Sequence, residues 1–372
     1  MKIPFVIHAN AQKAPLRKIN KHIEIVGSSN PRLNAMARDA QLSMLAVLRS
    51  RYTRVAITIV DDMADLEHLA AKKPDLVVLG MKLVLLEPDK GYDDSPKVWL
   101  SSYLEAHNIA YTGSGTTALA LEFDKPEAKQ AVIDAGLQSS AYFISSIKQP
   151  IFGHNLRYPL FVKPTNRGDS KGIDEMSVAH SQAALERKIV AIHTECSSDV
   201  LVEEYLSGRE FSVAVIQQPG SDELLAMPIE ISTPADTKGN SFLSEAVKEA
   251  NTEKVLAVTD DALKQALNEL AIGVFTALGS RDYGRIDMRL DGSGVPSFIE
   301  ANLMPGLSDH GYLSRCFRLN EGTTYTDMIL SIVALGLQRT QPIPIAKAAS
   351  IVAQSSEELT ASRLATASTV VR

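Results

Sequence analysis

Cysteine is scarce in this sequence, with two thiols, Cys196 and Cys316, in 372 residues. Two cysteines do not build a disulfide framework, and these show neither C-x-x-C spacing nor a zinc-type pairing with histidine. We therefore expect both to be free thiols, as is usual in a reducing compartment.

Long apolar runs and basic clusters are also missing. The most apolar segment, residues 76–86, contains Lys82 and is too short to cross a bilayer. The first residues lack the apolar stretch and the cleavage site of a signal peptide. The net charge is −6, whereas a nucleic-acid-binding protein usually gathers lysine and arginine on one face. These absences argue against nucleic-acid and membrane partners and predict a cytoplasmic location.

The composition is that of an ordinary globular protein, with 45% hydrophobic and 22% charged residues. In the first third of the chain, strand signals alternate with segments of helical periodicity. Such an order predicts a parallel sheet with helices on its faces. We expect strands at 4–8, 54–60 and 75–79, and helices at 34–51, 63–72 and 98–107.

The rest of the chain mixes longer strands with helices and ends in a polar tail. We expect helices at 125–135, 260–277 and 323–337, and strands at 158–163, 200–204 and 210–217. Two further strands, 284–290 and 295–300, flank a glycine-bearing turn and are expected to form a hairpin. After Pro344 the chain is rich in alanine, serine and threonine, so we expect a frayed end.

The hairpin carries the strongest chemical signal. Alternate side chains of a strand point to one face, so Arg285, Asp287 and Arg289 share a face, and on the return strand Phe298, Glu300 and Asn302 do the same. The short turn should bring Asp287 close to the strand that bears Glu300. Two carboxylates and an amide oxygen are ligands that magnesium prefers. The alternative is an exposed hairpin with solvated charges.

Two other segments carry weaker signals. Residues 163–173 place Gly168 and Gly172 after a strand that ends near Lys163, which would let backbone amides and an ammonium approach phosphate oxygens. The loop lacks the P-loop order, so a plain turn stays an open alternative. Residues 201–210 offer backbone groups to an adenine edge and a carboxylate to a ribose. Their alternative is a strand that ends in solvated acids.

The order of these segments resembles that of the ATP-grasp superfamily, and most of all the D-alanine–D-alanine ligase family. The resemblance covers residues 109–337 and is faint before them. It is carried by Tyr111-Thr112-Gly113-Ser114-Gly115, Asp124-Lys125, Phe161-Val162-Lys163-Pro164, Val202-Glu203-Glu204, Gly208-Arg209-Glu210-Phe211, Gly284-Arg285-Ile286-Asp287, and Glu300-Ala301-Asn302 through Pro305-Gly306.

The resemblance implies an α/β ATP-grasp fold with an N-terminal Rossmann-like, parallel-sheet domain. On this basis we expect residues 1–115 to form that domain and 116–215 to form a central lid domain. Residues 216–345 would form the C-terminal domain with the metal site, and 346–372 a tail.

The same resemblance assigns roles to individual residues, with ATP and two Mg²⁺ ions as cofactors and Mn²⁺ as a substitute. Phosphate contacts fall to Lys125, Lys163 and, as the candidate for a third lysine, Lys248. The closing loop is Gly168 to Gly172, the adenine contacts are Glu203 and the backbone near Leu206, and the ribose carboxylate is Glu210. The metal ligands are Asp287, Glu300 and Asn302. The catalytic group comprises Arg285, which steadies the tetrahedral intermediate, Gly306 in the loop that receives the oxyanion, and Asp169 and Ser170 in place of paired serines.

The implied reaction joins a carboxylate to an amine. Transfer of the ATP γ-phosphoryl group turns the carboxylate of an amino acid or small peptide into an acyl phosphate, which an amine then attacks, releasing phosphate. Charge neutralisation on the phosphoryl oxygens is most of what a protein contributes to such a step. Arg285 and loop amides would stabilise the later oxyanion. The resemblance also suggests a homodimer.

The departures from the family pattern gather at the amino-acid subsites. No acid occupies residues 26–33, and Leu79-Gly80-Met81-Lys82 replaces a His-Gly motif. Gly311 stands where a hydroxyl residue is common, and residues 241–248 replace a tyrosine-bearing loop. Three interpretations stay open: a ligase for another amino acid or peptide, a D-alanine–D-alanine ligase itself, and a nucleotide-binding protein that has lost catalysis.

Overall fold

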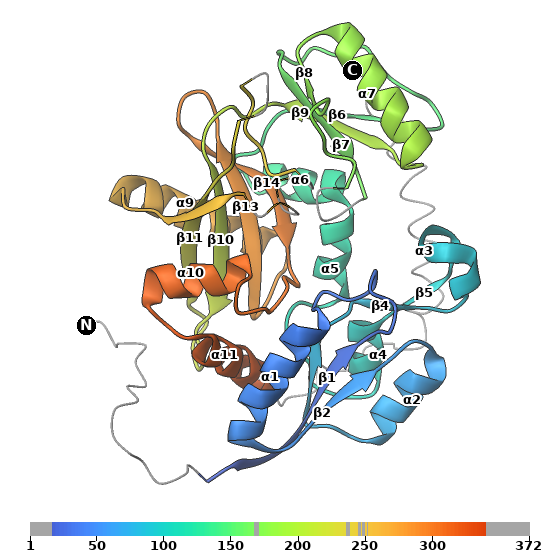
Figure 1. Ribbon diagram of the computed structural model, residues 1–372, viewed down its shortest axis with the longest axis vertical. Coiled ribbons are helices and arrows are strands. Elements are labelled where there is room, and N and C mark those ends of the chain that lie inside the picture. Colours follow the sequence, from blue (N-terminus) through green and yellow to red (C-terminus); the bar gives the residue numbers. More distant parts are fainter. Residues whose placement is uncertain are drawn as a thin grey trace.

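The computed structural model describes residues 17–339 except 167–170, 236–238, 245–246, 248–249 and 251. The architecture is α/β, as predicted, with separate sheets in its N-terminal, central and C-terminal parts (Figure 1). The strand expected at 4–8 and the tail expected at 346–372 lie outside the described residues. Among the helices of the described part, none combines the length and apolar character needed to cross a membrane.

A three-stranded parallel sheet forms the N-terminal part, in blue at the bottom of Figure 1. Its central strand, β1 (Ile19–Gly27), lies between β2 (Tyr52–Ile59) and β3 (Leu76–Leu79). Helices α1 (Arg38–Arg51) and α2 (Met63–Ala71) connect the strands, as the alternating pattern predicts. Shorter elements complete this part: β4 (Leu83–Leu85), a 3-10 helix (Pro88–Lys90), α3 (Gly91–Asp94), β5 (Lys97–Trp99) and α4 (Leu100–Ala106).

Strand β1 is absent from the predicted strands because polar residues interrupt its apolar pattern. His22 and Glu24 are nevertheless buried, and their Nε2 and Oε1 atoms lie 2.7 Å apart. The ammonium of Lys72 lies 3.4 Å from the other carboxylate oxygen of Glu24. Burial of these groups is tolerable because they are paired with one another.

A small antiparallel sheet, named the lid sheet after the predicted lid domain, lies at the top of Figure 1, with strand order β6-β9-β7-β8. Its strands are β6 (Tyr142–Ser145), β7 (Leu160–Pro164), β8 (Val178–Ala179) and β9 (Val200–Glu204). Helix α7 (Gln182–Glu195) covers this sheet and buries Leu185, Ile189 and Ile192 against it. The lid sheet and α7 therefore share a hydrophobic core of their own.

The C-terminal part is built on a five-stranded antiparallel sheet, with strand order β12-β11-β10-β13-β14. The strands are β10 (Glu210–Gln217), β11 (Leu224–Ser232), β12 (Lys254–Ala257), β13 (Tyr283–Leu290) and β14 (Pro296–Asn302). The helices are α9 (Asp261–Ala277), α10 (Tyr312–Glu321) and α11 (Tyr325–Gln338).

Both faces of this sheet are buried. In β10, Phe211, Val213 and Val215 belong to the core that includes α9, whereas Ala214 and Ile216 belong to the core of α10 and α11. This alternation is what the pleat of a strand dictates. Polar side chains on such a sheet are held between packed layers and have little freedom to move.

The predicted domain limits stay proposals, and the observed sheets lead us to propose two changes to them. The lid core ends with β9, whereas residue 215 lies within β10, so we propose a boundary between Glu204 and Glu210. Helices α5 (Thr116–Phe123) and α6 (Lys125–Asp134) were assigned to the lid, but both pack on β14. They therefore belong with the C-terminal sheet.

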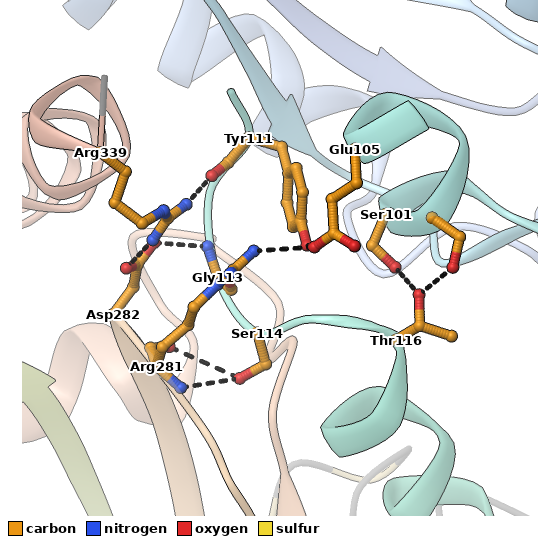
Figure 2. Close-up of polar contacts among 10 residues, drawn as sticks. Ser101, Glu105, Tyr111, Gly113, Ser114, Thr116, Arg281, Asp282 and Arg339 are labelled. Carbon is orange, nitrogen blue, oxygen red and sulfur yellow. Dashed lines mark hydrogen bonds and ion pairs between the residues drawn. The ribbon is translucent and has the colours of Figure 1, made fainter. Parts of the chain in front are cut away.

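A polar cluster fastens the N-terminal domain to the C-terminal part (Figure 2). Asp282, which precedes β13, accepts a hydrogen bond of 2.7 Å from the Gly113 amide and pairs with Arg339. The neighbouring Arg281 donates from Nε to the Gly113 carbonyl oxygen at 2.9 Å. Asp282 is buried and has a φ of +62°, a conformation that costs free energy for a residue with a side chain. The cluster therefore joins three distant segments.

We predict that the Asp282→Ala substitution destabilises the protein by about 2 kcal/mol, because it removes the acceptor of the buried Gly113 amide and the partner of the partly exposed Arg339. The free energy of unfolding in urea measures this effect. Asp222→Ala, in the exposed turn between β10 and β11, serves as the control. Equal stability of the two variants would contradict the role given to the cluster.

Candidate functional site

A pocket lies where the lid sheet faces the C-terminal sheet. Its apolar wall includes Phe161, Tyr205 and Phe242. The rings of Phe161 and Tyr205 stack with centroids 6.2 Å apart, and Phe161 meets Phe242 edge-on at 5.6 Å. Flat aromatic walls of this kind suit a planar ring. The pocket also gathers seven of the predicted site residues: Lys163, Glu203, Leu206, Glu210, Arg285, Asp287 and Glu300.

Strand β13 contributes three charged side chains to the pocket: Arg285, Asp287 and Arg289. Their shared face follows from strand alternation, as predicted. Arg285 donates to both oxygens of Asp287, with Nε–Oδ1 and Nη2–Oδ2 distances of 3.0 Å and 2.9 Å. The hydroxyl of Ser212 on β10 donates to the same Oδ1 at 2.5 Å. Asp287 is thus fixed in orientation by two neighbours.

The expected common face of Phe298, Glu300 and Asn302 is wrong at its first member. Asp287 pairs with Glu300, as predicted, but Met288 pairs with Phe298, so Ile299 is an extra residue in β14. A β-bulge of this kind resets the alternation of a strand. Phe298 consequently enters the hydrophobic core, and Ile299 lines the pocket beside Glu300.

The three predicted metal ligands lie on the two strands of the hairpin. Glu300 faces Asp287 across the strand pair and lies 3.4 Å from the Lys125 ammonium. The Oδ1 atom of Asn302 is buried and has no hydrogen-bond partner. An oxygen of this kind fits a cation, because a buried acceptor without a partner is costly. Among the described residues, no three His, Cys, Asp or Glu side chains cluster in a metal-binding arrangement, so a site here depends on the Asn302 amide.

A buried carboxylate with two lysines lies at the base of the pocket. The Oε1 atom of Glu203 is 2.6 Å from the Lys163 ammonium, and Oε2 is 2.8 Å from the Lys129 ammonium. Lys129 is fully buried and also donates to the hydroxyls of Ser139 and Ser140 at 2.9 Å. Lys129 was missed in the sequence, although it lies one helical turn after Lys125. The carboxylate of Glu203 anchors Lys163, and its implied contact with adenine stays a prediction.

Burial and charge act in opposite directions on this group. Burial alone would raise the pKa of Glu203, but the ammonium groups of Lys129 and Lys163 lower it to about 2. For Lys129 burial dominates, so its pKa lies below the ordinary value despite the nearby carboxylate. Pairing outweighs burial at Glu203 but not at Lys129, because Glu203 has two cationic partners and Lys129 shares one anion with Lys163.

Glu210, the predicted ribose carboxylate, lines the pocket beside Arg289. The Oε2 atom of Glu210 lies 3.2 Å from Nη1 of Arg289. Arg289 also donates to the carbonyl oxygens of Ser241 and Gly208 at 2.6 Å and 2.9 Å. Strand alternation places Arg289 on the pocket face, as predicted. Its hydrogen bonds hold the loop around Ser241 against β13.

The remaining predicted residues lie outside the pocket lining or outside the described residues. Gly172 has a φ of +78°, and a Cβ there would come within 2.8 Å of Pro164, so glycine is required at this position. A Cβ on Gly306 would lie 3.0 Å from the Ala35 carbonyl oxygen, which places its loop against the N-terminal domain. Gly168, Asp169, Ser170 and Lys248 are not among the described residues.

An acid does reach the loop after β1, although none is present in residues 26–33. Asp61, just after β2, accepts hydrogen bonds from the Ser28 hydroxyl at 2.5 Å and the Ser29 amide at 2.8 Å. Burial would raise the pKa of Asp61, but these hydrogen bonds outweigh it and lower the pKa. The carboxylate is therefore engaged in shaping the loop after β1.

The family profile described as D-ala D-ala ligase C-terminus matches residues 141–334, more than half of the chain. The chain belongs to the D-Ala–D-Ala ligase family. The predicted family is confirmed, and so is the class of enzyme, an ATP-dependent, ADP-forming ligase that joins a carboxylate to an amine.

Individual relatives of this D-Ala–D-Ala ligase family member extend the match. The uncharacterized protein y4sG of Sinorhizobium fredii strain NGR234 is 32% identical over 63% of this chain and 69% of its own. The D-alanine–D-alanine ligase of Pelodictyon phaeoclathratiforme is 28% identical over 82% and 85%. The crystal structure of the Bacillus anthracis D-alanine–D-alanine ligase with ATP superposes with a TM-score of 0.63 at 19% identity, covering 86% of this chain and 98% of that chain. That likeness confirms the predicted ATP-grasp fold.

The pKa of Glu203 predicts acid sensitivity in this member of the D-Ala–D-Ala ligase family. A carboxyl whose pKa is lower in the folded protein adds stability above about pH 4.5, and this is lost as the pH falls toward 2. Between pH 7 and pH 3 the loss from Glu203 amounts to about 2 kcal/mol. Unfolding in urea at both pH values would measure it.

The Glu203→Gln variant should be less stable at pH 7, because two buried ammonium groups lose their counterion. It should also lose less stability between pH 7 and pH 3 than the parent does. Glu269→Gln, at an exposed position of α9, is the control and should follow the parent. An identical acid-induced loss in parent and Glu203→Gln would refute the assignment.

Proposed function

We propose that the protein activates the carboxylate of an amino acid or small peptide as an acyl phosphate and joins it to the amine of a second small molecule. ATP supplies the phosphoryl group, and ADP and phosphate are released. The observation that carries this proposal is the pocket itself. It brings an anchored lysine, an arginine–carboxylate pair and the carboxylates of the hairpin to one aromatic-walled site.

The nucleotide would lie with its adenine against the wall formed by Phe161, Tyr205 and Phe242. Glu210 would accept from the ribose hydroxyls, as the family resemblance implies. Lys163 and Lys125 would neutralise the phosphates, because ammonium groups held in place before binding cost little reorganisation when charge develops. Lys163 is held by Glu203 at 2.6 Å, and Lys125 lies 3.4 Å from Glu300.

Asp287, Glu300 and Asn302 would hold Mg²⁺. Bound there, the metal supplies charge neutralisation on the transferred phosphoryl group. The protein prepares the set by aligning Asp287 with Ser212 and Arg285 and by leaving the buried Asn302 oxygen without a partner. The number of ions, and Mn²⁺ as a substitute, stay predictions.

Arg285 would stabilise the oxyanion that forms when the amine attacks. Its guanidinium is fixed by two hydrogen bonds to Asp287, so it meets developing charge without moving. Gly306 lies in the loop after β14 that would receive the acyl group. Asp169 and Ser170 keep the predicted role at the closing loop.

The proposal also concerns which small molecules are the substrates. D-Alanine–D-alanine ligation is the second candidate, favoured by the names of the relatives. The departures at Asp169, Gly311 and the loop after β1 favour another amino acid or a peptide. No nucleic acid or membrane partner is proposed, and the homodimer and the cytoplasmic location stay predictions.

Removal of a single metal ligand should abolish ATP turnover. We expect Asp287→Asn and Glu300→Gln to lower the rate of ADP release by about a hundredfold or more, because preorganised charge at a phosphoryl-transfer site contributes this much. Circular dichroism would verify that both variants fold. Asp222→Asn is the control, and near-parental turnover in both site variants would refute the metal assignment.

The substrate question has a direct assay, which is ADP release with a panel of D- and L-amino acids and mass detection of products. We expect D-alanine to saturate the enzyme only at high concentration, or another amino acid to be the better substrate. The physical reason is that a lost hydrogen bond to a substrate carboxylate weakens binding by about 1.5–3 kcal/mol. Efficient synthesis of D-alanyl-D-alanine at ordinary millimolar D-alanine would rule this out.

A further inference from the structure

The carboxylate of Glu253, just before β12, has a hydrogen-bond partner on only one of its two oxygens. Its Oε1 atom accepts a hydrogen bond of 2.9 Å from the hydroxyl of Tyr312. Its Oε2 atom is buried and has no hydrogen-bond partner. A buried carboxylate oxygen without a donor is costly, and proteins generally leave one only where a ligand or an ion supplies the missing bond.

Tyr312 connects this carboxylate to the pocket. It begins α10 and lines the pocket together with Arg285, whose guanidinium lies 5.5 Å from the centre of the Tyr312 ring. The guanidinium of Arg315 lies 5.8 Å from the same ring centre. Among the described residues, no carboxylate lies within ion-pair distance of Arg315. The Tyr312 side chain therefore contacts the Glu253 carboxylate, which has an oxygen without a donor, and the Arg315 guanidinium, which has no ion-pair partner among the described residues.

Of the five carboxylates that line the pocket, four lie beside cations, and the fifth, Glu204, accepts a hydrogen bond of 3.1 Å from the Arg157 amide. Glu203 binds Lys129 and Lys163, Asp287 binds Arg285, Glu210 binds Arg289, and Glu300 lies near Lys125. In the N-terminal domain, Asp61 already accepts hydrogen bonds from the loop after β1. An amino-acid substrate brings an ammonium group that needs a compensating carboxylate when it leaves water. Glu253 has the oxygen available for it.

We propose that Glu253, oriented by Tyr312, binds the ammonium group of the amino-acid substrate that donates the amine, and accepts the proton that this group loses before the amine attacks the acyl phosphate. This inference rests on the proposed function, because it assigns a subsite beside the same pocket, next to the pocket-lining residue Tyr312. Tyr312 acts as a positioning residue, since its hydroxyl holds one carboxylate oxygen and leaves the other for the ligand. The site then selects substrates that carry an ammonium group over uncharged analogues of the same shape.

The test compares the parent with Glu253→Gln, which keeps an acceptor for the Tyr312 hydroxyl but removes the negative charge. Steady-state ADP release is measured with the best amino acid of the panel, at saturating ATP and Mg²⁺. We expect the KM for that amino acid to rise about tenfold to a hundredfold, because a hydrogen bond between charged groups is lost. The KM for ATP should stay within about twofold of the parent value.

A second measurement separates charge recognition from a structural effect. The α-hydroxy acid with the same side chain lacks the ammonium group, and it is tested as an inhibitor. Its inhibition constant should be similar in parent and Glu253→Gln, so that discrimination between amino acid and hydroxy acid shrinks in the variant. Tyr312→Phe should raise the KM for the amino acid by a smaller factor, and Glu269→Gln should behave as the parent.

The outcomes test the proposed function and the Glu253 subsite separately. A parent enzyme that releases ADP with no member of the panel, extended by small peptides, overturns the proposed function. An active parent with an unchanged KM in Glu253→Gln overturns the subsite alone. Equal weakening of amino acid and hydroxy acid also overturns it, because a disrupted pocket would affect both ligands.

Discussion

The buried contact of one carboxylate with two ammonium groups governs the arrangement of this site. Glu203 on β9 reaches Lys163 on β7 at 2.6 Å and Lys129 on α6 at 2.8 Å. The first lysine belongs to the lid sheet, and the second belongs to a helix that packs on β14. Because an unpaired charge in the interior is costly, neither lysine can leave without a large loss of stability. The contact therefore holds the lid sheet against the sheet that carries the hairpin carboxylates.

The second constraint is the register of that hairpin. Asp287 faces Glu300, and the bulge at Ile299 turns Phe298 into the core while Glu300 stays at the pocket. The same strand places Arg285 and Arg289 on the pocket side. One pair of strands thus supplies the proposed metal ligands, the oxyanion donor and the residue that holds Glu210.

Much of this arrangement follows from the sequence, because strand alternation is a local rule. It places Arg285 and Asp287 on one face, and the glycine turn between the two strands brings Glu300 opposite Asp287. The bulge does not follow, since an extra residue in a strand leaves no local signal in this sequence. Lys129 was missed because its role depends on Glu203, 74 positions later in the chain. Strand β1 escaped prediction because its buried His22 and Glu24 look like surface residues until Lys72 is seen beside them.

The central claim is that the reaction proceeds through an acyl phosphate of the amino-acid substrate. Labelling the carboxylate of that substrate with oxygen-18 tests it directly, because the oxygen that attacks ATP leaves later with the phosphate. The account predicts that each turnover transfers one labelled oxygen to inorganic phosphate, detected by mass spectrometry. Phosphate without the label, formed together with the ligated product, would contradict it.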